Sequence, residues 1–235
     1  MNLIIDEGNT NIKLGAFAQD KLQWTETYQS IPEVMNRLRT VQIERVLLSS
    51  VKDTSEWLQL QDGFKIEVFD SNTPLPIKID YHSRETLGTD RIAAACGAFF
   101  IYPGQNCLIF DLGTCLTHGF IDKNGVFYGG SISPGMEMRF KALHQFTARL
   151  PYLGIEQEVL TTGNSTKSSI ISGVINGIVF EINGFIEFYQ NKYSEINVLI
   201  TGGNMLLFEK RLKQPIFAVT ELNLTGLNRI LKYNV

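Results

Sequence analysis

The sequence predicts an α/β protein composed of two lobes with the same topology. In the first half, apolar strand patterns alternate with helical patterns, which is typical of α/β proteins. Near residue 107 the pattern starts again. The stretches LIIDEGNTNIKLGAF and LIFDLGTCLTHGFI both end an apolar strand with Asp, followed by Gly and Thr. A one-residue gap in this degenerate repeat aligns Asp6 with Asp111, Gly8 with Gly113, Thr10 with Thr114 and Gly15 with Gly119. We therefore expect two lobes, 1–107 and 108–235.

The elements of the first lobe follow from local patterns. Alternating or continuous apolar residues predict strands, and helical spacing with polar start residues predicts helices. The expected strands are 2–6, 12–17, 21–29, 45–51, 64–70 and 75–81. The expected helices are 31–40, a helix from Thr54 or Ser55 to 61, and 89–102, which Pro103 and Gly104 end.

The second lobe opens with three strands between residues 107 and 134, with a hairpin turn at 123–125. A helix is expected over 136–150, ended by Pro151, and a long helix over about 165–192. The apolar positions of the long helix cover more than one face, which fits either a dimer interface or a central core helix. Residues 196–204 form a further strand that ends in glycines, and 221–234 close the chain.

Composition excludes several classes of protein. The 235 residues carry a net charge of −3, and Lys and Arg do not cluster, which disfavours a nucleic-acid or anionic membrane surface. The three cysteines lack metal-ligand spacing, so we expect reduced thiols in a cytoplasmic protein. The first residues lack a basic region, so no signal peptide is expected. The apolar run 92–102 is shorter than the roughly 20 residues that span a bilayer.

A carboxylate at the end of a strand, beside a glycine-containing turn, suits a site for phosphate and Mg²⁺. Backbone N–H groups surround phosphate oxygens, while the carboxylate holds the metal directly or through its waters. Asp6 has this position, and Lys13 on the returning strand could reach the same phosphates. Alone, the motif also fits an ordinary Asx hairpin turn. The repeat at Asp111 and the third strand-to-glycine turn in LITGGN favour the phosphate interpretation.

The segment GTDR at 88–91 is a second candidate for chemistry. Asp90 lies at a predicted helix start, where an acid commonly serves as a cap or first-turn residue. Arg91 would ordinarily be a solvated first-turn residue. In a phosphoryl-transfer site, however, an Asp that accepts the proton of the substrate hydroxyl is an expected component.

Six motifs together carry a resemblance to a known family. DEGNTNIK, GTDR, DLGTCLT, GGSISPG, TGNSTKSSIISG and LITGGN resemble, in order and spacing, the type III pantothenate kinases of the acetate-kinase/sugar-kinase/Hsp70/actin superfamily. The resemblance covers essentially the whole chain. It implies two ribonuclease-H-like (actin-like) lobes, each a mixed sheet with flanking helices, and an active-site cleft between them. The second lobe would contain the adenosine loop and a dimer helix.

The resemblance also implies an activity and a set of site residues. The activity is ATP-dependent phosphorylation of pantothenate to 4′-phosphopantothenate, the first step of coenzyme A biosynthesis, in a cytoplasmic homodimer. Asp90 would be the catalytic proton acceptor, Asp6 would hold Mg²⁺ through water, and Asp111 would hold a monovalent cation, K⁺ or NH₄⁺. The ATP-binding residues would be Asp6, Glu7, Gly8, Asn9, Thr10, Asn11, Ile12, Lys13 and Thr114. The pantothenate-binding residues would be Tyr81, Gly88, Thr89, Asp90, Arg91 and Thr166.

Two positions depart from the family pattern. Glu7 replaces a small or apolar residue, and strand alternation should turn its side chain away from Asp6. Cys115 stands where alanine is common, so we expect little effect beyond sensitivity to oxidation if it is exposed. The separated histidines His82, His118 and His144 are expected to be structural or surface residues.

Three other functions remain open from the sequence. The first is a kinase of the same superfamily that acts on another small hydroxyl or carboxylate substrate. The second is a non-catalytic regulator, because relatives of the family carry the name Bvg accessory factor. The third is an actin-like filament protein, which would need a heterologous contact surface. The acidic residues at positions 6, 90 and 111 favour catalysis over the regulator.

Overall fold

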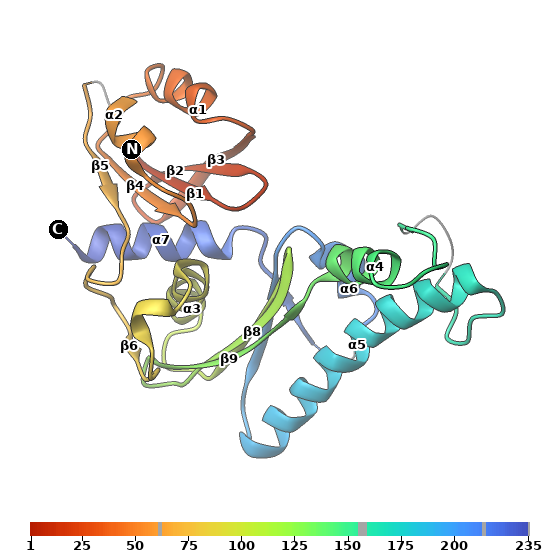
Figure 1. Cartoon of the computed structure of the whole chain (residues 1–235). Helices are drawn as coiled ribbons and strands as arrows, with labels where there is room; N and C mark the ends of the chain where they lie inside the picture. The colour runs from red at the N-terminus through yellow and green to blue at the C-terminus, as the bar shows by residue number, and fades with distance from the viewer. Residues whose placement is uncertain (61–62, 155–158, 213–214, 235) are drawn as a thin grey trace. The chain divides into compact units, whose positions relative to one another are not determined.

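A computed structural model describes residues 1–60, 63–154, 159–212 and 215–234 (Figure 1). The chain divides into two compact units. The first unit comprises Met1–Gly104, Lys123–Tyr128 and Glu221–Val235, and the second comprises Gln105–Asp122 and Gly129–Thr220. The expected division at residue 107 stays a prediction. The C-terminal segment, which the sequence pattern places after the second repeat, belongs by its contacts to the first unit.

The first unit contains a five-stranded mixed sheet in the order β3-β2-β1-β4-β5. Strand β2 is antiparallel to both β1 and β3, whereas β1, β4 and β5 are parallel. The strands are β1 (Asn2–Glu7), β2 (Ile12–Ala18), β3 (Lys21–Tyr28), β4 (Arg45–Ser50) and β5 (Ile66–Val68). This sheet confirms the predicted strands, although β5 is shorter than the pattern suggested.

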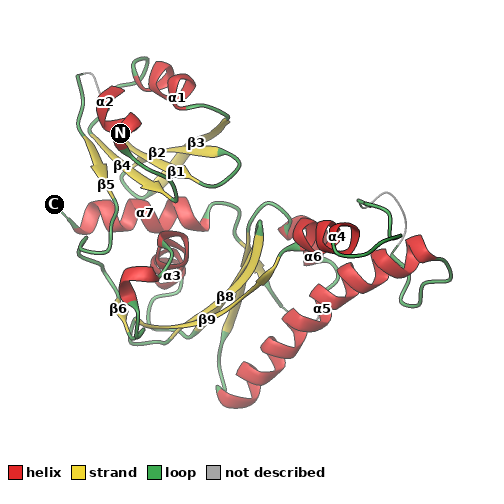
Figure 2. Ribbon diagram, in the orientation of Figure 1, coloured by secondary structure: helices red, strands yellow, loops and turns green. Residues whose placement is uncertain are grey.

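Helices cover both faces of this sheet (Figure 2). Helices α1 (Ile31–Leu38) and α2 (Ser55–Leu60) enclose one apolar core. Helices α3 (Thr89–Ile101) and α7 (Leu222–Tyr233) pack against each other on the opposite face. The two helices meet at glycines, since a Cβ on Gly226 would lie 1.8 Å from the carbonyl oxygen of Ala93. The short 3₁₀ helix η1 (Arg84–Thr86) precedes α3.

A six-stranded sheet has the order β11-β10-β7-β8-β9-β6, and all of it except β6 and the first residues of β9 belongs to the second unit. Strand β10 is parallel to β7 and β11, and β8 is antiparallel to β7. The strands are β7 (Cys107–Leu112), β8 (Cys115–Ile121), β9 (Val126–Pro134), β10 (Asn197–Thr201) and β11 (Phe217–Ala218). The short strand β6 (Lys78–Ile79) pairs with the first residues of β9, which belong to the first unit.

The two sheets share one topology, which confirms the predicted α/β fold with two similar halves. Strands β1, β2, β3, β4 and β5 correspond in order to β7, β8, β9, β10 and β11. The correspondence extends to register. Asp6 pairs with Lys13 on β2 and Ser49 on β4, and Asp111 pairs with Thr117 on β8 and Thr201 on β10.

Helix α5 (Thr166–Lys192) is the main core helix of the second unit. Its buried side chains pack on β7 and β10 together with residues of α4 (Met136–Gln145) and α6 (Met205–Glu209). By length and hydropathy alone α5 could cross a membrane, and 44% of its most apolar window is buried within the protein. This packing supports the interpretation of α5 as a core helix, which the sequence left open.

Helix α4 ends at Gln145, five residues before the predicted end at residue 150. Phe140 is the last buried residue of α4, and Phe146 is 81% exposed. The Thr147 hydroxyl donates a 2.6 Å hydrogen bond to the Leu143 carbonyl. Residues 146–149 are exposed and within 146–150 only Leu150 packs against the core, so tertiary packing gives a helix in this segment little stabilisation. Helix α6 and strand β11 were not predicted.

Candidate functional site

In the first unit, three polar side chains share one face of the sheet. Lys13 stands directly opposite Asp6 in the antiparallel pair β1–β2, and Ser49 is in register with Asp6 in the parallel pair β1–β4. Residues paired in this way project to the same face. Asn2, four residues before Asp6, donates a 3.3 Å hydrogen bond to Asn228 of α7. Asp6, Lys13 and Ser49 therefore lie on the face that α3 and α7 cover.

Lys13 has an acidic partner that the sequence did not indicate. Its ammonium group lies 3.3 Å from the Glu221 carboxylate at the start of α7. The Lys13 side chain is 41% exposed and that of Glu221 is 21% exposed. The pair is thus open to solvent on the lysine side, where an incoming anion can approach.

The turn between β1 and β2 exposes backbone and small polar groups. The Gly8 amide donates a 3.1 Å hydrogen bond to the Asn11 carbonyl, which closes the turn. Asn9, Thr10 and Asn11 are exposed. Gln29 of the β3–α1 connection holds the Asn11 side chain with a 2.9 Å hydrogen bond. An ordered turn with exposed amides fits a phosphate-binding hairpin.

Glu7 lies on the other face of the sheet, as strand alternation predicts. Its carboxylate is buried and accepts hydrogen bonds from the Trp57 indole at 2.8 Å and the Ser50 hydroxyl at 2.7 Å. The Lys52 ammonium group lies 3.4 Å away. The side chain of Glu7 is therefore engaged beneath α2, and any contact between Glu7 and a nucleotide would be made by its backbone.

The segment Gly88–Arg91 forms the start of α3. The Ser49 hydroxyl donates a 3.1 Å hydrogen bond to the Thr89 hydroxyl. The Asp90 carboxylate accepts a 2.8 Å hydrogen bond from the Arg91 amide. A Cβ at Gly88 would lie 2.4 Å from the Asp90 carboxylate oxygen, so only glycine leaves room for this arrangement. Asp90 is partly buried and still accessible to a small substrate.

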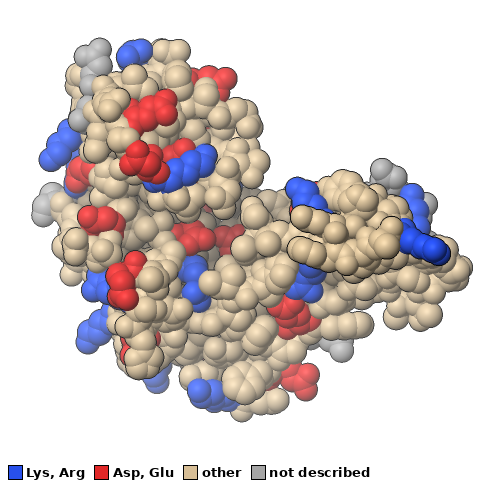
Figure 3. Space-filling view, in the orientation of Figure 1, with Lys and Arg blue, Asp and Glu red and all other residues tan. Residues whose placement is uncertain are grey.

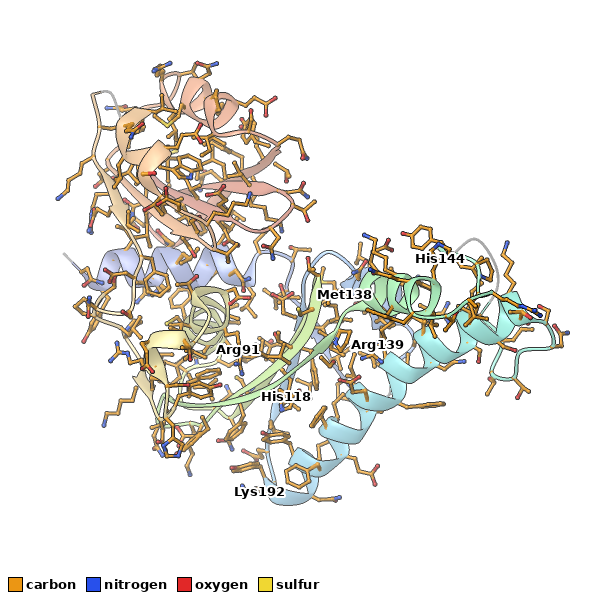
Figure 4. The ribbon with its side chains drawn as sticks, in the orientation of Figure 1. Arg91, His118, Met138, Arg139, His144 and Lys192 are labelled. Atoms are coloured by element: carbon orange, nitrogen blue, oxygen red, sulfur yellow. The ribbon has the colours of Figure 1, made fainter. Side chains whose placement is uncertain are left out.

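Arg91, labelled in Figure 4, is buried rather than solvated, and its guanidinium group contacts two aromatic rings. The centre of its guanidinium group lies 5.8 Å from the ring of Tyr81 and 5.9 Å from that of Phe127. Both distances are within the range of cation–π attraction. The structure thus brings the predicted substrate residues Tyr81 and Arg91 together. Phe127 was not predicted, because it lies in a strand distant in sequence.

In the second unit, Asp111 is the penultimate residue of β7 and lies beside two glycine-containing segments. A Cβ at Gly202, whose φ is +92°, would lie 2.4 Å from the Asp111 carboxylate oxygen. A Cβ at Gly135 would lie 2.4 Å from the Thr114 carbonyl oxygen and 2.5 Å from that of Gly113. Thr114 is exposed. Glycine at position 202 thus leaves room for the Asp111 carboxylate, and glycine at position 135 leaves room for the carbonyl oxygens of Gly113 and Thr114.

Thr166 is exposed at the first residue of α5, in the second unit. The preceding Ser165 caps this helix by accepting a hydrogen bond from the Ser168 amide. The predicted substrate residues Tyr81 and Gly88–Arg91 belong to the first unit. The structure describes the positions of Tyr81 and Gly88–Arg91 within the first unit. That Thr166 contacts the same substrate stays a prediction.

The residues at Asp6 fit the way in which Mg²⁺ binds with a nucleotide. Among the described residues, no group of three or more His, Cys, Asp or Glu side chains could hold a metal ion alone. Mg²⁺ usually keeps several waters and is held by one or two carboxylates together with substrate phosphates. A single carboxylate near the end of a strand, beside a turn that is expected to bind phosphate, is consistent with that mode.

Charges on the described surface are mixed. On the face shown in Figure 3, Lys and Arg side chains are interspersed with Asp and Glu, in keeping with the net charge of −3.

Comparison with known proteins identifies the family. The family model for type III pantothenate kinase matches residues 2–188. A type III pantothenate kinase of Cytophaga hutchinsonii is 58% identical over 235 residues, with both chains fully covered. One of Bacteroides fragilis is 42% identical and covers all of this chain and 98% of its own. The chain belongs to the type III pantothenate kinase family.

Solved structures agree with this membership of the type III pantothenate kinase family at the level of fold. A Baf family protein of Campylobacter jejuni has a TM-score of 0.68 at 21% identity, covering 99% of this chain and 98% of its own. A glucokinase from an Antarctic psychrotroph has a TM-score of 0.55 at 12% identity, covering 99% and 98%. At these identities the similarity shows the fold alone, which is that of the sugar-kinase/actin-like proteins.

Proposed function

We propose that this type III pantothenate kinase transfers the γ-phosphoryl group of ATP to pantothenate and forms 4′-phosphopantothenate, the first step of coenzyme A biosynthesis. The observation that carries the proposal is the 58% identity to a type III pantothenate kinase over the full length of both chains. The polar face of the first unit, with Asp6, Lys13 and the start of α3, supplies the groups that such a reaction requires.

In this proposal Asp90 accepts the proton of the pantothenate hydroxyl. As this O–H bond breaks, the hydroxyl oxygen forms a bond to the γ-phosphorus, the bond between that phosphorus and the β–γ bridging oxygen breaks, and ADP leaves. Tyr81 and the segment Gly88–Arg91 hold pantothenate, with Thr166 as a further contact. The Arg91 guanidinium, fixed between the rings of Tyr81 and Phe127, suits an anionic substrate.

The triphosphate is held by residues of both repeats. In the first unit, the segment Asp6–Lys13 binds phosphates through its turn amides and the Lys13 ammonium group, and Asp6 holds Mg²⁺ through water. In the second unit, Thr114 contacts ATP and Asp111 holds a monovalent cation, K⁺ or NH₄⁺. Bound Mg²⁺ neutralises charge on the phosphates. Phosphoryl transfer is accelerated mainly by this positioning and charge stabilisation.

We further propose that the protein is a cytoplasmic homodimer. Phe180 and Phe188 of α5 are 65% and 62% exposed, and Ile132 on β9 is 63% exposed. Phe180 and Phe188 also line an open surface depression of about 480 Å³, together with His118, Glu181, Gly184, Phe185 and Tyr189. An apolar surface of this kind on a helix is typical of a subunit interface. Analytical ultracentrifugation of the wild-type protein and of Phe180→Glu tests this assignment.

A coupled ADP-release assay tests the activity and the role of Asp90 together. The wild-type protein should release ADP only when pantothenate is present, and faster with K⁺ than without it. Asp90→Asn should fold normally, bind ATP and lose about 10²–10⁴-fold in kcat, the usual contribution of a general base. Asp70→Asn is the matched control, because Asp70 is an exposed turn residue whose hydrogen-bond acceptor an Asn side chain keeps. Near-wild-type kcat for Asp90→Asn would remove Asp90 from its role.

A further inference from the structure

Ser49 is a buried polar residue with a specific partner. It is only 2% exposed, and its hydroxyl donates a 3.1 Å hydrogen bond to the hydroxyl of Thr89, forty residues further along the chain. A hydroxyl group buried without a partner would cost free energy, so the bond constrains where both residues lie. Ser49 is thus a direct link between β4 and the first residue of α3.

In the first turn of α3, the Arg91 guanidinium contacts the rings of Tyr81 and Phe127, and the Ser49–Thr89 hydrogen bond is a separate link to strand β4. The residue that caps the helix is Gly88, which has no side chain with which to cap it. The Asp90 carboxylate bonds to the amide of the next residue, Arg91, so that bond lies within the turn and does not tie it to the sheet. The hydroxyl pair between Ser49 and Thr89 connects this turn to the sheet.

The register of the strands places the Ser49–Thr89 link next to Asp6. Ser49 is paired with Asp6 on the neighbouring strand β1, so both side chains project to the same face. Thr89 immediately precedes Asp90. The second unit has the same feature at the equivalent position, where the buried residue Thr201 is in register with Asp111. Both halves therefore place a buried hydroxyl residue beside the strand-end carboxylate.

We propose that Ser49 is a positioning residue for phosphoryl transfer. Through Thr89 it holds the first turn of α3, and with it the Asp90 carboxylate, at a set position relative to the strand that carries Asp6. This inference rests on the proposed role of Asp90 as proton acceptor. Ser49 itself does not touch the reacting atoms. Its loss should impair the chemical step and leave nucleotide binding intact.

Ser49→Ala, compared with Ser50→Ala, provides the test. Ser50 is the adjacent residue, but its hydroxyl bonds to Glu7 on the opposite face of the sheet. Ser49→Ala should lower kcat about 10- to 100-fold, the effect of a small misplacement of a catalytic group. The KM for ATP should change less than about twofold, because the phosphate-binding turn is untouched. Ser50→Ala should lower stability without lowering kcat.

Two further measurements separate positioning from a general loss of structure. Hydrogen exchange of the first-turn amides of α3 should accelerate in Ser49→Ala and stay unchanged in Ser50→Ala. The double variant Ser49→Ala/Asp90→Asn should be no slower than Asp90→Asn alone, since Ser49 acts through Asp90. If Ser49→Ala fails to fold, Ser49→Cys, with similar volume and a weaker donor, replaces it and should give an intermediate kcat.

Several results would overturn the proposal. Unchanged kcat in a folded Ser49→Ala or Ser49→Cys, or equal losses in Ser49→Ala and Ser50→Ala, would exclude a positioning role. So would a further loss in the double variant. If Asp90→Asn instead retains wild-type kcat, the proposed role of Asp90 as proton acceptor is wrong. This result can be told apart from a failure of the Ser49 proposal, because Ser49 is unchanged in that variant.

Discussion

The Nε1–H group of Trp57 donates a 2.8 Å hydrogen bond to the buried carboxylate of Glu7. Glu7 follows Asp6 directly in the chain, yet its side chain lies on the opposite face of the sheet, beneath α2. The additional acid in the segment proposed to bind phosphate therefore does not add its charge to the face on which Asp6 lies. The Glu7 carboxylate accepts hydrogen bonds from Trp57 and Ser50, and the Lys52 ammonium group balances its charge.

Trp57→Phe should destabilise the protein without impairing its use of ATP. The change keeps an aromatic ring but removes a donor to a buried carboxylate, which costs about 1–3 kcal/mol of unfolding free energy. Urea denaturation measures this cost, and the KM for ATP should stay within about twofold of wild type. Trp24→Phe is the control, because Trp24 is only half-buried and stacks under Arg37 at 4.4 Å. A large rise in the KM for ATP in Trp57→Phe would contradict this prediction and would indicate that the Glu7 side chain contributes to the ATP site.

Glu221→Gln should lower the KM for ATP. The Glu221 carboxylate lies 3.3 Å from the Lys13 ammonium group and competes with phosphate oxygens for it. A partly exposed ion pair contributes at most about 1 kcal/mol, so the decrease should be about two- to fivefold. Steady-state kinetics against MgATP measure the change. Glu26→Gln on β3, which removes the ion pair between Glu26 and Arg37 of α1, should leave the KM unaltered. An increased KM would show that Glu221 assists nucleotide binding.

Asp111→Asn should weaken the response to K⁺. Asp111 lies beside the carbonyl-rich segment around Gly113 and Gly135 in the second unit, and its charge is expected to hold the monovalent cation. Loss of that charge should raise the K⁺ concentration for half-maximal activity about tenfold, equivalent to about 1.4 kcal/mol. Titration of activity with KCl at constant ionic strength measures this value. Glu195→Gln, an exposed residue of the same unit, should titrate as wild type does, and an unchanged midpoint in Asp111→Asn would refute the assignment.

Asp20 should contribute to stability in a pH-dependent way. Burial tends to raise the pKa of its carboxyl group, but hydrogen bonds and charge from Lys232 and Arg229 lower it below the usual 3.8. Because the folded state has the lower pKa, the contribution is present above pH 3.8 and is lost as pH falls through the folded pKa. The Asp20 side chain is 42% exposed, so Asp20→Asn should cost at most about 1 kcal/mol at pH 7. Urea unfolding at several pH values should show the difference shrinking in acid; a difference that persists there would contradict it.

Among the three cysteines, Cys115 should be the reactive one. Burial raises the pKa of the Cys96 thiol, and it raises that of Cys107 to about 12 although a hydrogen bond to Asn197 lowers it. Cys115 is only partly buried. Iodoacetamide at pH 8 should therefore modify Cys115 first, as measured by mass spectrometry, because the thiolate is the reactive form. MgATP should slow this reaction if the neighbouring Thr114 contacts ATP, and rapid labelling of Cys107 in the folded protein would contradict the assignment.

Local patterns were sufficient to predict most of the fold. Strand alternation placed β1 and β2 and turned Glu7 away from Asp6, because neighbouring residues on a strand face opposite sides. The helix end near residue 145 was missed. Its position depends on which side chains find a core to pack against, and the spacing of residues in the sequence does not contain that information.

The strand-end carboxylates, the internal repeat and membership of the kinase family were readable from the order of residues. Each of these depends on short segments whose chemistry and periodicity are local. The residues that contact those segments could be identified only from the tertiary structure. Ser49 meets Thr89 across forty residues, and Lys13 meets Glu221 across 208. Such contacts are decided by strand order, register and the packing of α3 and α7 on one face, which no local pattern specifies.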